Sequence, residues 1–165
     1  MYAITGITGK VGGEIARNLL AHGQSVRAVL RDQAKAAAWA AKGCEIAIAE
    51  MENAGQLAAA FAGARGVFIL PPSDFDPAPG YPEAQRVIDS VTRALMTARP
   101  KQIVCLSTIG ADAPHDNLLT QRTLMERSLS AIGLPVTFLR PGQSCRSRSP
   151  PRAHPRRSEA AYRSS

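Results

Sequence analysis

The sequence of 165 residues predicts an α/β fold in which a doubly wound parallel sheet carries helices on both faces. Short apolar or β-branched runs alternate with stretches of helical periodicity along most of the chain. Each helical stretch is long enough to cross over between two parallel strands, which a hairpin turn cannot do. The alternation stops after Pro141-Gly142, where a polar segment rich in Arg, Ser and Pro begins.

Taken in order, the elements are marked by local residue patterns. The predicted strands are short runs of apolar and β-branched residues: 2–5, 25–30, 44–49, 66–70, 102–107 and 135–140. The predicted helices are marked by apolar spacing, abundant Ala or a terminal Gly: 10–22, 33–42, 53–61, 84–98 and 116–132. Together they predict a Rossmann-type fold over residues 1–142, as one domain.

Several of these elements have distinctive features. The first helix has an apolar face of Val11, Ile15 and Leu19, at a spacing of four. The run GVFIL at 66–70 is apolar throughout, which is typical of a strand buried on both faces. The five prolines between residues 71 and 83 predict a loop.

Charge and cysteine content narrow the class of protein. The net charge is +7, but residues 140–165 carry seven arginines and a single acid, Glu159, so the remainder is nearly neutral. We expect residues 143–165 to be a disordered tail. Its one aromatic residue, Tyr162, offers little for stacking on bases, so nucleic-acid binding is not expected.

The three cysteines are widely separated and have no metal-ligand spacing, and Cys105 lies in an apolar run that predicts a buried thiol. With no apolar run of the roughly 18 residues needed to span a bilayer, we expect a cytoplasmic protein that does not enter membranes.

Three glycines, Gly6, Gly9 and Gly12, follow the first strand and open the first helix. Glycines at that turn permit a tight turn, close approach of backbone to a pyrophosphate, and close packing of helix on strand. The N-terminus of the helix adds unpaired N–H groups and a partial positive charge, and Thr8 and Lys10 add a hydroxyl and a cation. The pattern predicts a dinucleotide site.

The end of the second strand indicates which dinucleotide. An NAD-binding protein places a carboxylate about 20 residues beyond the glycines, whereas a guanidinium suits the 2′-phosphate of NADP. Arg31 comes first here, with Asp32 after it and Lys35 nearby. We expect NADP to be favoured over NAD, although Arg31 could instead be a solvated charge.

Two further strand ends supply candidate cofactor contacts. Glu50 and Met51 follow the third strand and are expected beside the adenine. Leu70, Pro71 and Pro72 follow the fourth strand and are expected on the far side of the cleft, although the two prolines could simply begin a rigid loop.

The segments ITGITGKVGGEIARNLLAHGQSVRAVLRD, VFILPPS, IVCLSTIGA and GLPVTFLRPG resemble the NmrA-like atypical short-chain dehydrogenases. That group includes bacterial NADPH-dependent quinone reductases and fungal redox-sensing regulators. The resemblance spans about residues 2–142 and implies a Rossmann domain that binds NAD(P), with Arg31 as the residue that selects NADP. The glycine-rich loop of the family maps onto Gly6, Thr8, Gly9, Lys10, Val11 and Gly12.

The sequence departs from that family in two respects. Relatives continue with a smaller substrate-binding lobe, whereas here an Arg/Ser/Pro tail follows residue 142; we expect a truncated or frameshifted reading frame that leaves activity in doubt. The Tyr with a Lys four residues later, typical of ordinary short-chain dehydrogenases, is missing, so no catalytic residue is assigned. Ser107 and Thr108 are expected to bond to the backbone, and Leu118, Met125 and Leu129 to belong to the core.

Two functions are compatible with these features. The first is an NADPH-dependent oxidoreductase of quinone-like substrates, since hydride transfer to a quinone requires mainly proximity and orientation. The second is a non-catalytic sensor that binds NAD(P) and a protein partner.

Overall fold

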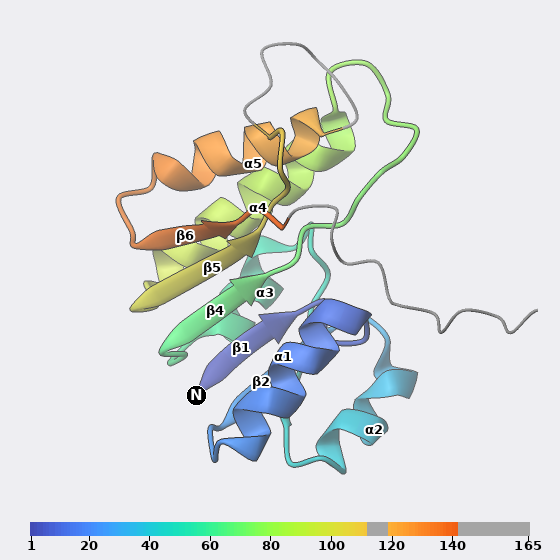
Figure 1. The fold of residues 1–165 in the computed structure, drawn as a ribbon, viewed down its shortest axis with the longest axis vertical. Helices are drawn as coiled ribbons and strands as arrows, with labels where there is room; N and C mark the ends of the chain where they lie inside the picture. Colours follow the sequence, from blue (N-terminus) through green and yellow to red (C-terminus); the bar gives the residue numbers. More distant parts are fainter. Residues whose placement is uncertain (112–118, 142–165) are drawn as a thin grey trace, which may run out of the picture.

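The computed structural model describes residues 1–111 and 119–141. Within them lies one parallel sheet whose strands are β1 (Tyr2–Thr5), β2 (Val26–Leu30), β3 (Glu45–Ile48), β4 (Gly66–Ile69), β5 (Gln102–Leu106) and β6 (Val136–Leu139). The helices are α1 (Lys10–Ala21), the 3-10 turn η1 (Gln33–Lys35), α2 (Ala36–Ala40), α3 (Ala54–Phe61), α4 (Pro82–Ala98) and α5 (Thr120–Ser130). The strand order is β3-β2-β1-β4-β5-β6, so the doubly wound parallel sheet is confirmed (Figure 1).

The chain begins in the middle of the sheet. It first builds outward through β2 and β3, and then α3 carries it back to β4, which pairs with the other side of β1. The order therefore reverses between β1 and β4, and it is outside the carboxyl ends of such strands that α/β proteins bind ligands. The buried Thr5 joins the two strands there, because its Oγ1 donates to the Phe68 carbonyl (3.1 Å) and accepts from the Leu70 N–H (2.8 Å).

Helices cover the sheet on both faces (Figure 1). α1 and α2 pack on one face, over a core that includes Ile4, Phe68 and Trp39. α3, α4 and α5 pack on the other face, over a larger core that includes Phe61 and Leu95. All four residues of β4 are buried, as its apolar run predicts. Among the described residues, no helix combines the length and the apolar character needed to cross a membrane.

The first helix packs on the sheet partly through its predicted apolar face and most closely through small residues beside it. Ile15 and Leu19 are partly buried against the core, whereas Val11 is 44% exposed. The buried residues of the helix are Gly12, Gly13 and Ala16. The reason is distance: a Cβ on Gly13 would lie 3.0 Å from the Ile7 carbonyl oxygen. Only small residues allow α1 to lie this close to the sheet.

Two other boundaries differ from expectation, and two fall outside what is described. The predicted helix 33–42 is divided into η1 and α2, because the Asp32 side chain caps Ala34 and starts a tighter turn. The helix α4 begins at Pro82, whose missing N–H costs nothing at a helix start. The predicted disordered tail and the predicted helix start at 116–118, which includes Leu118, lie outside the described residues. Met125, Leu129 and Cys105 are buried, as predicted.

Candidate functional site

The glycine-rich loop is shaped by its own backbone. Gly6 has φ +62°, and a Cβ there would lie 2.5 Å from Leu70 Cδ2. The Gly9 N–H donates to the Gly6 carbonyl (3.0 Å), which closes the turn. A Cβ on Gly12 would lie 2.5 Å from the Gly6 oxygen, so α1 can start this close to the loop only with glycine at that position. Gly6 and Gly12 thus have the turn and packing roles that the motif predicts.

The N-terminus of α1 remains available to a ligand. Its N-cap is Gly9, which offers no side-chain cap to the N–H groups of the first turn. Thr8, Gly9, Lys10 and Val11 are all exposed around it. The helix is 12 residues long and its N-terminus is uncapped. Together with the Thr8 hydroxyl and Lys10 beside it, this N-terminus suits the pyrophosphate of a dinucleotide.

The end of β2 presents a free guanidinium. Arg31 is exposed and forms no hydrogen bond or ion pair with any described residue. Asp32, the alternative ribose ligand, is engaged locally: its Oδ1 accepts from the Ala34 N–H (2.9 Å) and its Oδ2 pairs with Lys35 Nζ (3.5 Å). The group left free to meet a ligand at this strand end is therefore Arg31.

The remaining predicted contacts lie at the carboxyl ends of β3 and β4. Glu50 is exposed, and its N–H is held by the Gln56 side chain (2.9 Å). Met51 is partly buried against the larger core. Leu70 lies against Gly6, so the structure brings the end of β4 directly to the glycine loop.

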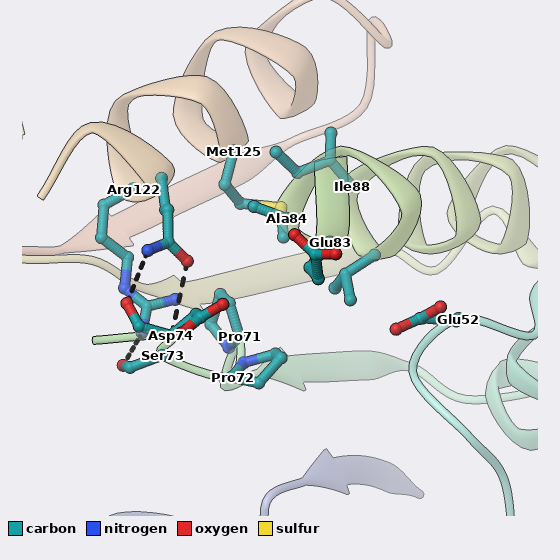
Figure 2. Close-up of a pocket in the computed structure, with 12 residues that line it drawn as sticks. Glu52, Pro71, Pro72, Ser73, Asp74, Glu83, Ala84, Ile88, Arg122 and Met125 are labelled. Atoms are coloured by element: carbon teal, nitrogen blue, oxygen red, sulfur yellow. Dashed lines mark hydrogen bonds between the residues drawn. The ribbon is translucent and has the colours of Figure 1, made fainter. Parts of the chain in front are cut away.

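Two hollows lie beside this edge, on the β4–β5 side. The first, which we call the apolar pocket, has a volume of about 170 Å³ (Figure 2). It is lined by Glu52, Pro71, Pro72, Ser73, Asp74, Glu83, Ala84, Val87, Ile88, Gln121, Arg122 and Met125. The second, the hydroxyl pocket, has a volume of about 220 Å³. It is lined by Ser73, Asp74, Phe75, Ser107, Thr108, Leu119, Gln121 and Arg122. Pro71 and Pro72, predicted as cofactor contacts, line the apolar pocket, and no residue of the glycine loop lines either.

The loop after β4 is fastened to α5 where the two pockets meet. Gln121 Nε2 donates to the Asp74 carbonyl (2.7 Å), and Gln121 Oε1 accepts from the Asp74 N–H (3.4 Å). Arg122 Nη2 donates to Ser73 Oγ (2.6 Å), as Figure 2 shows. Burial lowers the pKa of Arg122 from its ordinary value. The sequence left open that Arg122 faces the cleft, but no local pattern links it to residues 73 and 74.

The two hydroxyls that end β5 behave differently from one another. Thr108 Oγ1 donates to the Ile109 carbonyl (3.2 Å), as expected for a strand-end hydroxyl. Ser107 Oγ is buried and makes no hydrogen bond of ordinary geometry to any described residue, so the expected backbone bond is wrong for Ser107. Its side chain faces Glu126 of α5 instead, and hydrogen bonding from the hydroxyl contributes, after that from Arg140, to lowering the pKa of this carboxyl.

A carboxylate–guanidinium pair fixes the end of β6 to α5. Arg140 Nε donates to Glu126 Oε1 (2.9 Å), and Nη2 donates to the other carboxylate oxygen. These bonds hold the pKa of the buried Glu126 below its ordinary value. They position the helix from which Gln121 and Arg122 extend.

The fold and the loop together define a dinucleotide-binding protein of the Rossmann class, and comparisons with known proteins assign it to a family. The family described as NAD(P)H-binding matches residues 6–153, and the chain belongs to it. The sequence is 30% identical over 144 residues to an NAD(P)H azoreductase of Xenophilus azovorans, covering 86% of this chain and 48% of that protein.

Solved structures give a consistent result. An NADPH-dependent quinone oxidoreductase from Escherichia coli, in complex with NADPH, superimposes with a TM-score of 0.72 at 26% identity, over 85% of this chain and 48% of that one. A triphenylmethane reductase from Citrobacter sp., in complex with NADP(H), gives a TM-score of 0.72 at 26% identity, over 84% and 48%. The chain is thus an NAD(P)H-binding domain that resembles quinone oxidoreductases and an azoreductase, and it spans about half the length of these relatives.

Proposed function

We propose that this chain binds NADPH in preference to NADH and serves hydride transfer to a quinone-like acceptor. The observation that carries the proposal is the glycine loop, with Gly6 at positive φ, Gly12 against the Gly6 carbonyl, and an uncapped α1 start above them. Gly6, Thr8, Gly9, Lys10, Val11 and Gly12 would hold the pyrophosphate.

The proposed preference for NADPH depends on Arg31. A guanidinium recognises a phosphate through charge-assisted hydrogen bonds, and Arg31 has no competing partner among the described residues. Asp32 is already engaged with Ala34 and Lys35. Glu50 and Met51 would lie on the adenine side, and Leu70, Pro71 and Pro72 on the opposite side of the cleft.

The bound nicotinamide would supply the hydride, and the chain would hold the acceptor in position beside it. The apolar pocket offers Pro71, Val87, Ile88 and Met125 to a planar apolar acceptor. Reduction of a quinone by hydride transfer depends mainly on how closely and in which orientation the nicotinamide and the quinone are held. The absence of a Tyr–Lys pair in the sequence therefore does not prevent this chemistry. The alternative is a non-catalytic sensor that binds NAD(P), and what favours it is that the chain spans only about half the length of its relatives.

A cytoplasmic location is part of this proposal. Cys44 and Cys105 are both free and both buried, which suits a reducing compartment.

The test combines a cofactor titration with an activity assay on the purified chain. We expect saturable NADPH binding, followed by NADPH oxidation that depends on an added quinone. Binding without quinone-dependent oxidation would support the sensor instead. Failure to bind either NADPH or NADH would contradict both functions.

A further inference from the structure

We propose that the hydroxyl pocket is a subsite for an anionic oxygen group, a carboxylate or sulfonate, carried by an aromatic substrate, with Arg122 as its main ligand. The inference rests on the proposed function, since it names the substrate class of the same cleft. Arg122 lies where the two pockets meet, so an anion bound there would leave the aromatic body facing the apolar pocket.

The first support is the charge of Arg122, which no described residue neutralises. Arg122 is partly buried, and its one hydrogen bond from the side chain goes to a neutral hydroxyl, Ser73 Oγ at 2.6 Å. No carboxylate among the described residues lies within 4.0 Å of it. Buried arginines are ordinarily paired, because an isolated charge away from water is costly.

The second support is the supply of unused donors around that guanidinium. An arginine side chain has five N–H donors, and most of those of Arg122 have no acceptor among the described residues. Ser73 Oγ accepts from Arg122, so its own hydrogen remains to be donated. Ser107, which also lines the hydroxyl pocket, is directed toward Glu126 and is not counted among these donors. A guanidinium beside a hydroxyl suits a flat anion with two or three oxygens.

The third support is the placement of the acidic groups. Glu52 and Glu83 line the apolar pocket only, and both are paired with Arg86, at 3.0 Å and 3.3 Å. Asp74 lines both pockets, but its Oδ1 accepts from the Asp76 N–H (3.0 Å) within its own loop. Glu126, four residues after Arg122 on α5, is paired with Arg140 (2.9 Å). Among the described residues, therefore, no acid forms an ion pair with Arg122. Figure 2 shows the Arg122 side chain extending from α5 to Ser73, away from Glu52.

The test uses two probes that differ in charge but share the same ring system, anthraquinone-2-sulfonate and anthraquinone-2-sulfonamide. Calorimetry gives the dissociation constant of each, with and without saturating NADP⁺. We expect the wild type to favour the sulfonate by about tenfold or more, as charge-assisted hydrogen bonds imply. Arg122→Gln should remove that preference and Arg122→Lys should retain part of it. The matched control is Arg127→Gln, on the exposed side of the same helix, which should leave the preference unchanged.

Each other outcome overturns the proposal. Equal affinity for the two probes, weak binding of both, or an unchanged preference in Arg122→Gln would show that Arg122 binds no substrate anion. A fall in NADP⁺ affinity in Arg122→Gln would instead assign the guanidinium to a phosphate of the cofactor. Thermal unfolding checks that the variant is folded, since Arg122 also holds the loop after β4 through Ser73. Since the probes are also titrated without cofactor, failure of NADP⁺ binding would count against the proposed function and leave this test intact.

Discussion

The two halves of the carboxyl edge of the sheet differ in whether backbone or side chains form the surface that faces a ligand. At the β1–β2 half, the ligand-facing surface is largely backbone, made of glycines and the uncapped start of α1, with the exposed side chains of Thr8, Lys10 and Arg31 beside it. At the β4–β5 half, it is made of side chains contributed by the loop after β4, the end of β5 and the start of α5.

This difference separates a general task from a specific one. A backbone cradle recognises a pyrophosphate, which is the same in every dinucleotide, and needs only that side chains be absent. A pocket of side chains can be varied residue by residue and therefore suits the substrate, which differs among relatives. The following predictions test whether the two halves act separately.

The largest effect is expected at Gly12. In Gly12→Ala the new Cβ would lie 2.5 Å from the Gly6 oxygen, so the loop and α1 must move apart. We expect a loss of about 1–3 kcal/mol in the free energy of unfolding from this overpacking, together with at least a tenfold loss of NADPH affinity. Urea unfolding and a cofactor titration measure the two.

The matched control for that variant is Gly55→Ala, within α3, where a Cβ would have its nearest neighbour, Asn53 Oδ1, at 3.5 Å. It should be neutral or slightly stabilising, since Ala favours a helix. If Gly12→Ala bound NADPH as the wild type does, the cradle would not depend on the absence of a side chain.

The second effect concerns the hydrogen bonds by which Thr5 of β1 connects the two halves. Thr5→Val keeps the shape of the buried side chain but leaves the Phe68 carbonyl and the Leu70 N–H without their partner. We expect a loss of about 1–3 kcal/mol of stability, measured by urea unfolding. Thr5→Ser, which retains the hydroxyl, should lose less. A Thr5→Val protein as stable as the wild type would show that the two strands need no such bridge.

The smallest effect on stability is expected at Glu126, in the side-chain half. Its folded pKa is lowered, chiefly by the hydrogen bonds from Arg140. The stabilisation is therefore present above the unfolded pKa of about 4.3 and is lost as the pH falls through the lower folded value. At pH 7, Glu126→Gln should cost about 1–2 kcal/mol, because Arg140 is 38% exposed and solvent weakens the pair.

The difference in stability between the wild type and Glu126→Gln, followed by urea unfolding from pH 7 to pH 3, should shrink on acidification. Glu14→Gln, which removes an exposed pair with Arg17, is the control and should show no resolvable change. A difference that stays constant with pH would mean that the carboxylate of Glu126 does not stabilise the fold through its charge.

The same contrast explains what could be predicted from the sequence. The fold and the glycine loop were predictable because strand and helix periodicity and the unique backbone freedom of glycine are local properties. Which side of α1 is buried was less predictable, because it depends on how closely Gly12 and Gly13 approach the rest of the fold. The contact of Arg122 with Ser73 joins residues 49 positions apart and exists only once the sheet is assembled, so no local pattern reveals it.

The most direct measurement of the central claim, that the β1–β2 half recognises NADPH, is the dissociation constant of NADPH and of NADH for the wild type and Arg31→Ala at two ionic strengths. The wild type should favour NADPH by roughly tenfold to a hundredfold, the value of one or two charge-assisted hydrogen bonds. Arg31→Ala should erase most of that preference and barely change NADH affinity. Added salt should weaken NADPH more than NADH, because Arg31 is exposed and its attraction is screened. Equal affinity of the wild type for both cofactors, or a preference that survives in Arg31→Ala, would contradict the account.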